Sequence, residues 1–104
     1  MSKSEAKKIA KKYKETLEAE NYPVSTLFIF GSSVKGNTST WSDIDVAVVS
    51  ERVAENYDKG RFALWQLRRK VDLRIEPHGF SPKDWEDDGN PMVHEIKKTG
   101  ERIA

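Results

Sequence analysis

Two carboxylates and a glycine–serine turn are the residues of this chain whose types and spacing could do chemistry. Asp43 and Asp45 open an apolar run and are separated by one residue, so on a β-strand both side chains point to the same side. Neighbouring carboxylates repel each other and lose solvation, so such a pair usually needs a cation. Gly31 and Ser32 close an earlier apolar run, and ten residues separate Ser32 from Asp43.

A Gly–Ser turn that leads into a helix suits a phosphate group. Glycine keeps side-chain atoms away from the anion, and the N–H groups at a helix start point towards it. The Ser32 hydroxyl adds a donor, although an ordinary helix cap uses the same geometry. Lys35 is the basic residue of this loop, and Asp72 lies in another strand-like segment. Three carboxylates beside a phosphate-binding turn indicate a magnesium site.

The hydrophobic pattern predicts the elements that must position these residues. A capping-box signature at Ser2 and Glu5 begins a first helix that ends at Asn21. Strands are predicted over residues 24–30, 44–49 and 71–76, and helices over 54–69, after Ser81 and after Asn90. This alternation predicts an α/β fold with a small mixed sheet, helices mainly on one face and the carboxylates at the open edge.

Composition bounds the class of protein. The 104 residues are expected to form one domain, 1–104. A net charge of +1 gives no strong nucleic-acid signal and no membrane attraction. The sequence has no cysteine, which excludes disulfides and fits a reducing compartment. Its apolar runs are far shorter than the roughly 20 residues of a membrane helix, so we expect a cytoplasmic protein.

Several other polar and aromatic residues are interpreted as structural. The lysines of the first helix are interpreted as a solvated face, and Glu76 as part of a salt-bridged strand surface. His78 and His94 are too far apart in sequence to suggest a metal pair. Trp41 is close to the carboxylates in sequence, and we expect its side chain to pack in the protein rather than to stack on a base.

The order of these motifs resembles the nucleotidyltransferase superfamily of DNA polymerase beta and kanamycin nucleotidyltransferase, and in particular its minimal members. The resemblance covers about residues 24–100. It implies that Gly31, Ser32 and Lys35 hold the triphosphate of ATP or another nucleoside triphosphate. It also implies that Asp43, Asp45 and Asp72 bind two magnesium ions. One departure is Ser33, where relatives often carry arginine.

The resemblance implies a magnesium-dependent transfer of AMP from ATP to a hydroxyl acceptor. Asp43 and Asp45 would bridge both metals, and Asp72 would hold the catalytic metal or take the acceptor proton. With 104 residues, we expect no acceptor domain of its own in this chain. Similar proteins pair with a small HEPN-type helical protein, which implies an antitoxin that adenylylates a tyrosine of its partner.

Two alternatives remain open at this point. One is a non-catalytic antitoxin that neutralises its partner by forming a complex. The other is a transferase that acts on a small hydroxylated molecule, with the acceptor pocket at the interface of a homo-oligomer.

Overall fold

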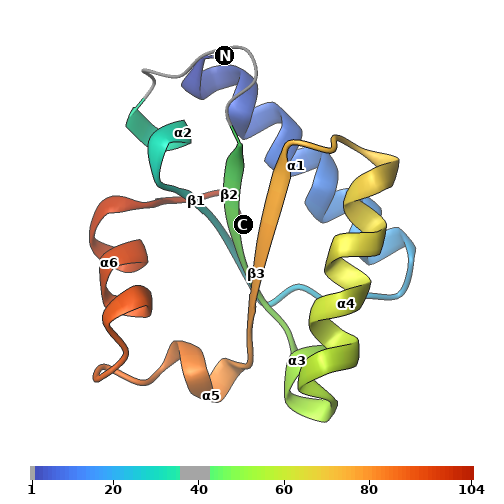
Figure 1. Cartoon of the computed structure of the whole chain (residues 1–104), viewed down its shortest axis with the longest axis vertical. Helices are drawn as coiled ribbons and strands as arrows, with labels where there is room; N and C mark the ends of the chain where they lie inside the picture. Colours follow the sequence, from blue (N-terminus) through green and yellow to red (C-terminus); the bar gives the residue numbers. More distant parts are fainter. Residues whose placement is uncertain (1, 36–42) are drawn as a thin grey trace.

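A mixed four-stranded sheet forms the centre of the molecule. The computed structural model describes residues 2–35 and 43–104 (Figure 1), so Trp41 and the side chain of Lys35 lie outside the described part. The strand order is β3-β2-β1-β4. The strands are β1 (Thr26–Phe30), β2 (Ile44–Val49), β3 (Ile75–Phe80) and β4 (Glu101–Arg102). Because β1 is antiparallel to β2 and β4 whereas β2 and β3 are parallel, the predicted mixed sheet is confirmed.

The helices lie close to where the sequence predicts them, except that one predicted helix is divided into two. They are α1 (Lys3–Ala19), α2 (Ser32–Lys35), α3 (Glu51–Glu55), α4 (Tyr57–Leu67), the 3-10 helix η1 (Arg68–Lys70), α5 (Pro82–Trp85) and α6 (Pro91–Thr99). Ser2 caps α1 by accepting the N–H of Glu5. The helix predicted over 54–69 is divided because Asn56 has an extended backbone and its side chain caps α4.

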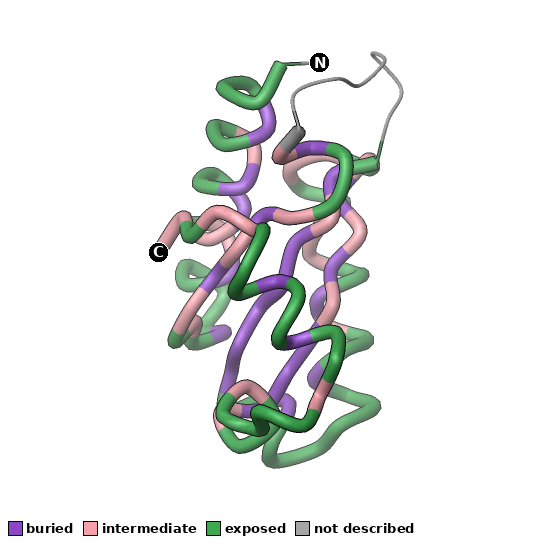
Figure 2. Tube along the Cα trace, turned by 90° about the vertical axis from the view of Figure 1, so that its left-hand side faces the viewer, coloured by how far each residue is buried: buried purple, intermediate pink, exposed green. Residues whose placement is uncertain are grey.

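Helices cover both faces of the sheet. The two longest, α1 and α4, cover one face, where Tyr13, Leu17 and Leu64 pack against Leu27 and Val46. The short helices α5 and α6 lie on the other face, where Val93 and Ile96 form a second core with Ala47, Val49 and Phe80. Figure 2 shows the buried strands between these layers. The second face is the one that matters for the site.

The strand predicted over 71–76 is wrong in its bounds. Residues 71–74 form a turn, and β3 begins at Ile75. The Asp72 carboxylate accepts the backbone N–H of Arg74 at 2.9 Å, and the Arg68 guanidinium donates to the Leu73 carbonyl, so side chains hold these residues as a turn. Pro77 lies within β3, which is tolerated because β3 is an edge strand.

Candidate active site

The strand β2 presents Asp45 on the α6 face of the sheet. Side chains alternate along β2, so Ile44 and Val46 face α1 whereas Asp45, Ala47 and Val49 face the opposite way. Asp45 is half-buried, and Asp43, which immediately precedes the strand, is exposed. The α6 face therefore carries a carboxylate at the end where β2 begins.

Glu76 brings a third carboxylate to the same place. In the parallel register Asp45 lies opposite Glu76, so their side chains share a face. Burial raises the pKa of Glu76, the negative charges of Asp43 and Asp45 raise it further, and a hydrogen bond with Asp45 adds to the effect. The nearby His78 opposes the shift. Asp43, Asp45 and Glu76 are thus close enough to repel one another.

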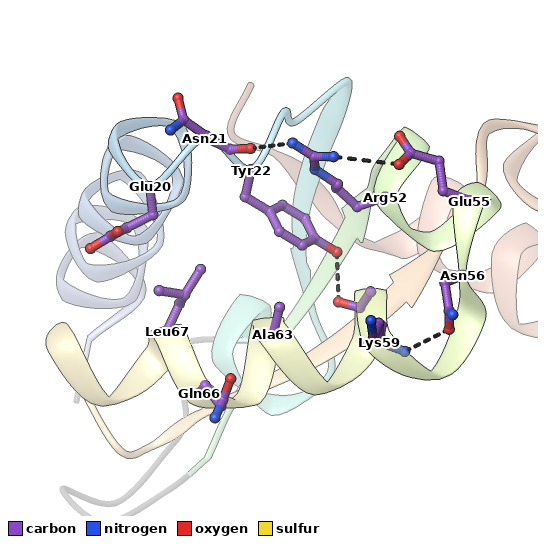
Figure 3. A pocket seen from close by; sticks show the side chains of 11 residues that line it. Glu20, Asn21, Tyr22, Arg52, Glu55, Asn56, Lys59, Ala63, Gln66 and Leu67 are labelled. Atoms are coloured by element: carbon purple, nitrogen blue, oxygen red, sulfur yellow. Dashed lines mark hydrogen bonds and ion pairs between the residues drawn. The ribbon is translucent and has the colours of Figure 1, made fainter.

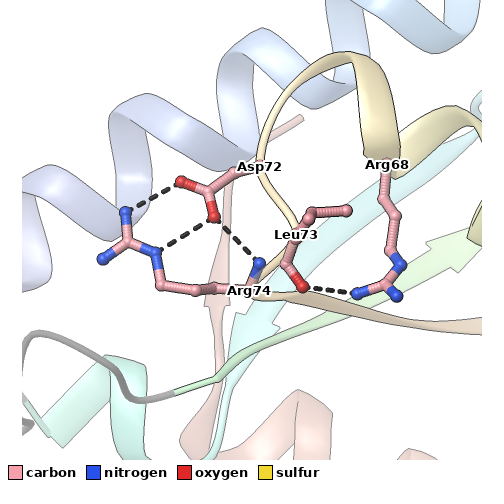
Figure 4. Close-up of polar contacts among 4 residues, drawn as sticks. All are labelled: Arg68, Asp72, Leu73 and Arg74. Carbon is pink, nitrogen blue, oxygen red and sulfur yellow. Dashed lines mark hydrogen bonds and ion pairs between the residues drawn. The ribbon is translucent and has the colours of Figure 1, made fainter.

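The structure places Asp72 elsewhere. Its Oδ1 accepts from Arg74 Nε at 3.0 Å, and its Oδ2 accepts from Arg74 Nη2 at 2.8 Å (Figure 4). The hydrogen bond from the Arg74 side chain is the main cause that lowers the pKa of Asp72. This pair lies beside α1, where the charge of Glu5 also acts on Arg74. Asp72 is therefore not brought together with Asp43 and Asp45.

His78 contacts the site from the same strand as Glu76. Its Nε2 lies 3.3 Å from Asp45 Oδ1, and its ring packs against Phe30 with the centroids 5.2 Å apart. An ionised Asp45 can only accept, so this hydrogen bond requires the proton on Nε2. Glu76 and His78 are separated by one residue, like Asp43 and Asp45. This shared spacing is the sequence signal that could have identified both residues.

Gly31 makes room for Asp45. Its φ is +70°, and a Cβ built at this residue would lie 2.6 Å from Asp45 Oδ2. Any side chain would therefore displace the carboxylate, and glycine alone adopts this backbone conformation without strain. Ser32 is exposed, whereas Ser33 is buried and donates its hydroxyl to the Phe30 carbonyl at 2.9 Å. Ser33 thus ties α2 to the end of β1.

The donor set fits magnesium that arrives with a nucleotide. No three His, Asp or Glu side chains in residues 2–34 and 43–104 form a cage that could hold an ion. Asp43, Asp45 and Glu76 nevertheless supply the oxygen donors that magnesium prefers, and magnesium commonly completes its shell with water and substrate phosphates. Asp45 Oδ2 lies close to Gly31, so one of these donors is next to the turn. The three carboxylates therefore fit a site in which protein and nucleotide bind magnesium together, rather than a cage formed by the protein alone.

A separate cavity of about 410 Å³ lies between the end of α1 and helices α3 and α4 (Figure 3). Its main polar groups already have partners in the protein. The Tyr22 hydroxyl donates to the Gly60 carbonyl at 2.8 Å, and Arg52 donates to the Asn21 carbonyl at 2.9 Å. Arg52 follows the carboxyl end of β2, whereas Asp43 precedes its amino end, so this cavity does not border the carboxylates.

Comparison with known proteins identifies the family of this fold. The family model described as "Nucleotidyltransferase domain" matches residues 8–92. The chain therefore belongs to the nucleotidyltransferase domain family. A solved structure of a "putative nucleotidyltransferase from Sulfolobus solfataricus" superposes with a TM-score of 0.54 at 21% identity, over 98% of this chain and 84% of that one, and shows the same fold.

One curated relative has a more specific name. It is the "Putative protein adenylyltransferase MJ1215" of Methanocaldococcus jannaschii, which is 47% identical over 45 residues. The match covers 43% of this chain and 51% of the relative, so the chain spans about half the length of that protein. In the described part of the chain, no helix has the length and apolar character needed to cross a membrane.

Proposed function

We propose that this protein is a magnesium-dependent nucleotidyltransferase that moves AMP from ATP to a hydroxyl group of a protein. The observation that carries the proposal is the convergence of Asp43, Asp45 and Glu76 beside the Gly31 turn. Membership of the nucleotidyltransferase family supports the reaction type. The name of the relative from Methanocaldococcus jannaschii supports AMP as the group and a protein as the acceptor.

Each residue of the site has a proposed task. Asp43, Asp45 and Glu76 would hold magnesium, and we assign Glu76 the third position because Asp72 is held by Arg74 beside α1. Bound magnesium would neutralise phosphate charge and orient the reacting groups. The Gly31–Ser32 turn, with Lys35, would bind the triphosphate through backbone N–H groups, one hydroxyl and one ammonium. His78 would keep Asp45 in place through its Nε2 proton.

We further propose that the acceptor is a tyrosine of a HEPN-type helical partner and that the transfer is an antitoxin reaction. Supporting this is the resemblance of the motifs around Gly31, Asp43 and Asp45 to minimal nucleotidyltransferases. A macromolecular acceptor also fits the exposure of Asp43, which leaves the entrance of the site accessible to a large substrate.

Labelled ATP tests the proposal directly. The chain is incubated with magnesium, the HEPN-type partner protein and ATP labelled at its α-phosphate. We expect label on the partner and a mass increase of one AMP on a tyrosine. ATP labelled at the γ-phosphate should leave the partner unlabelled, which excludes a kinase. The double variant Asp43→Asn with Asp45→Asn is the matched inactive control.

Each other outcome points to a different function. If the partner binds but neither protein carries label, the chain is a binding module and the proposed reaction is wrong. Label recovered only in a small molecule would instead identify a low-molecular-weight acceptor.

A further inference from the structure

A cavity of about 310 Å³ borders the Gly31 turn, and no group placed so far uses it. Phe30, Gly31 and Val34 line one side of the cavity, where β1 passes into α2. Glu95, Ile96 and Thr99 of α6 line the other side. The cavity therefore begins at the turn that is proposed to hold the triphosphate.

The walls of this cavity suit a flat apolar group and not a phosphate. Phe30 offers an aromatic ring, and Val34 and Ile96 offer aliphatic surface. No basic side chain of the described residues lines the cavity, whereas the acidic residue Glu95 does. The Thr99 hydroxyl donates to the Glu95 carbonyl at 2.9 Å, so towards a ligand it acts mainly as an acceptor. The polar groups therefore select a ligand that carries hydrogen-bond donors.

We propose that this cavity binds the nucleoside of the nucleoside triphosphate substrate. The base would lie against Phe30 and Ile96, and Glu95 would accept a hydrogen bond from a ribose hydroxyl or a base amino group. The volume is at the small end of the range for ligand pockets, about 300–1,000 Å³, which fits one base with its sugar. This proposal rests on the proposed function, because it takes the triphosphate to lie at Gly31–Ser32.

The order of residues across the sheet argues that the cavity does not take the acceptor. Phe30 of β1, Asp45 of β2 and Glu76 of β3 are neighbours in register, so they form one row across three strands. In phosphoryl transfer the attacking and leaving oxygens lie roughly in line, on opposite sides of phosphorus. The leaving pyrophosphate would lie at the β1 end of the row, beside Gly31. The acceptor therefore enters from the β3 end, past Glu76.

Calorimetry with two ligands tests the assignment. The affinities of ATP and of inorganic triphosphate are measured in the presence of magnesium for the wild type and for Glu95→Ala and Thr99→Phe. We expect the wild type to bind ATP about tenfold or more tighter than triphosphate. Glu95→Ala and Thr99→Phe should each remove most of this preference while the triphosphate affinity changes little. Both residues are exposed on α6, so the variants should fold, which melting curves verify.

A charge-matched control separates contact from long-range electrostatics. Glu86→Ala removes an equal charge at an exposed position outside the cavity and should leave the preference for ATP unchanged. The proposal is overturned if the wild type binds ATP and triphosphate equally, or if the α6 variants leave the ratio unchanged; triphosphate binding would still support the proposed function. If neither ligand binds with magnesium, the proposed function itself fails, and this inference fails with it.

Discussion

Glu76 of β3 lies directly opposite Asp45 of β2 in the parallel register of the sheet. Asp72 precedes Glu76 by four residues but lies in the turn before β3, where Arg74 binds both of its carboxylate oxygens. The two acidic residues are therefore close in sequence and different in role. Glu76 completes a set of repelling carboxylates, whereas Asp72 stabilises a turn.

Substitution should distinguish these two carboxylates. Glu76→Gln should abolish AMP transfer and weaken magnesium-dependent ATP binding, because it removes a charged oxygen donor from the site. Asp72→Asn should retain both properties and lose about 1 kcal/mol of stability, as expected for a partly exposed ion pair. The labelled-ATP assay and thermal melting measure the two effects. The reverse pattern, with transfer lost in Asp72→Asn alone, would return Asp72 to the metal site.

The same residues should give opposite dependences of stability on pH in metal-free buffer. The pKa of Glu76 is raised in the folded chain by burial and by Asp43 and Asp45. The folded state therefore binds more protons than the unfolded state, and the stability from Glu76 is full below the ordinary glutamate pKa and lost as pH rises through the raised pKa. The pKa of Asp72 is lowered, so its stability is present above the ordinary aspartate pKa and lost as pH falls through the lowered pKa.

Melting temperatures measured across this acidic range would show both effects. In Glu76→Gln, the melting temperature should fall less than in the wild type as pH rises just above the ordinary glutamate pKa. In Asp72→Asn, it should fall less than in the wild type as pH decreases on the acid side. A Glu76→Gln curve parallel to that of the wild type would contradict the convergence of the three carboxylates.

Gly31→Ala should damage both the fold and the site. The positive φ costs a non-glycine residue roughly 1–2 kcal/mol, and the added Cβ would press on Asp45 Oδ2. Combining Gly31→Ala with Asp45→Ala removes that contact, so the double variant should lose less stability than the sum of the single losses. Ser32→Ala is the control, because an exposed side chain should change stability by less than about 0.5 kcal/mol. If urea unfolding shows that the double variant loses the sum of the two single losses of stability, the contact with Asp45 does not restrict the side chain at residue 31.

His78 should act on binding through Asp45. His78→Phe keeps a ring beside Phe30 but loses the Nε2 donor, and we expect the affinity for ATP with magnesium to fall by about tenfold, as for other residues that orient metal ligands. His78→Gln retains a donor and should recover part of the loss. Calorimetry on both variants measures this, and equal affinity in His78→Phe and the wild type would rule out a positioning role.

The local sequence patterns predicted the helices, the first two strands and the opposite faces of Ile44 and Asp45. They did not predict where β3 begins, because residues 71–73 alternate like a strand while side chains of Arg68 and Asp72 hold them as a turn. Pro77 and Gly79 also weaken the strand signal over Glu76 and His78. The register that sets Glu76 opposite Asp45 joins segments about thirty residues apart, and no local pattern encodes it.

The most direct test of the central claim is calorimetric titration of ATP with and without magnesium. Asp43, Asp45 and Glu76 repel one another, so magnesium and ATP should bind together far more tightly than either binds alone. The double variant Asp43→Asn with Asp45→Asn should lose this synergy while its melting temperature in metal-free buffer stays unchanged or rises. If magnesium does not strengthen ATP binding to the wild type, the carboxylates of this sheet face are not a nucleotide-dependent metal site.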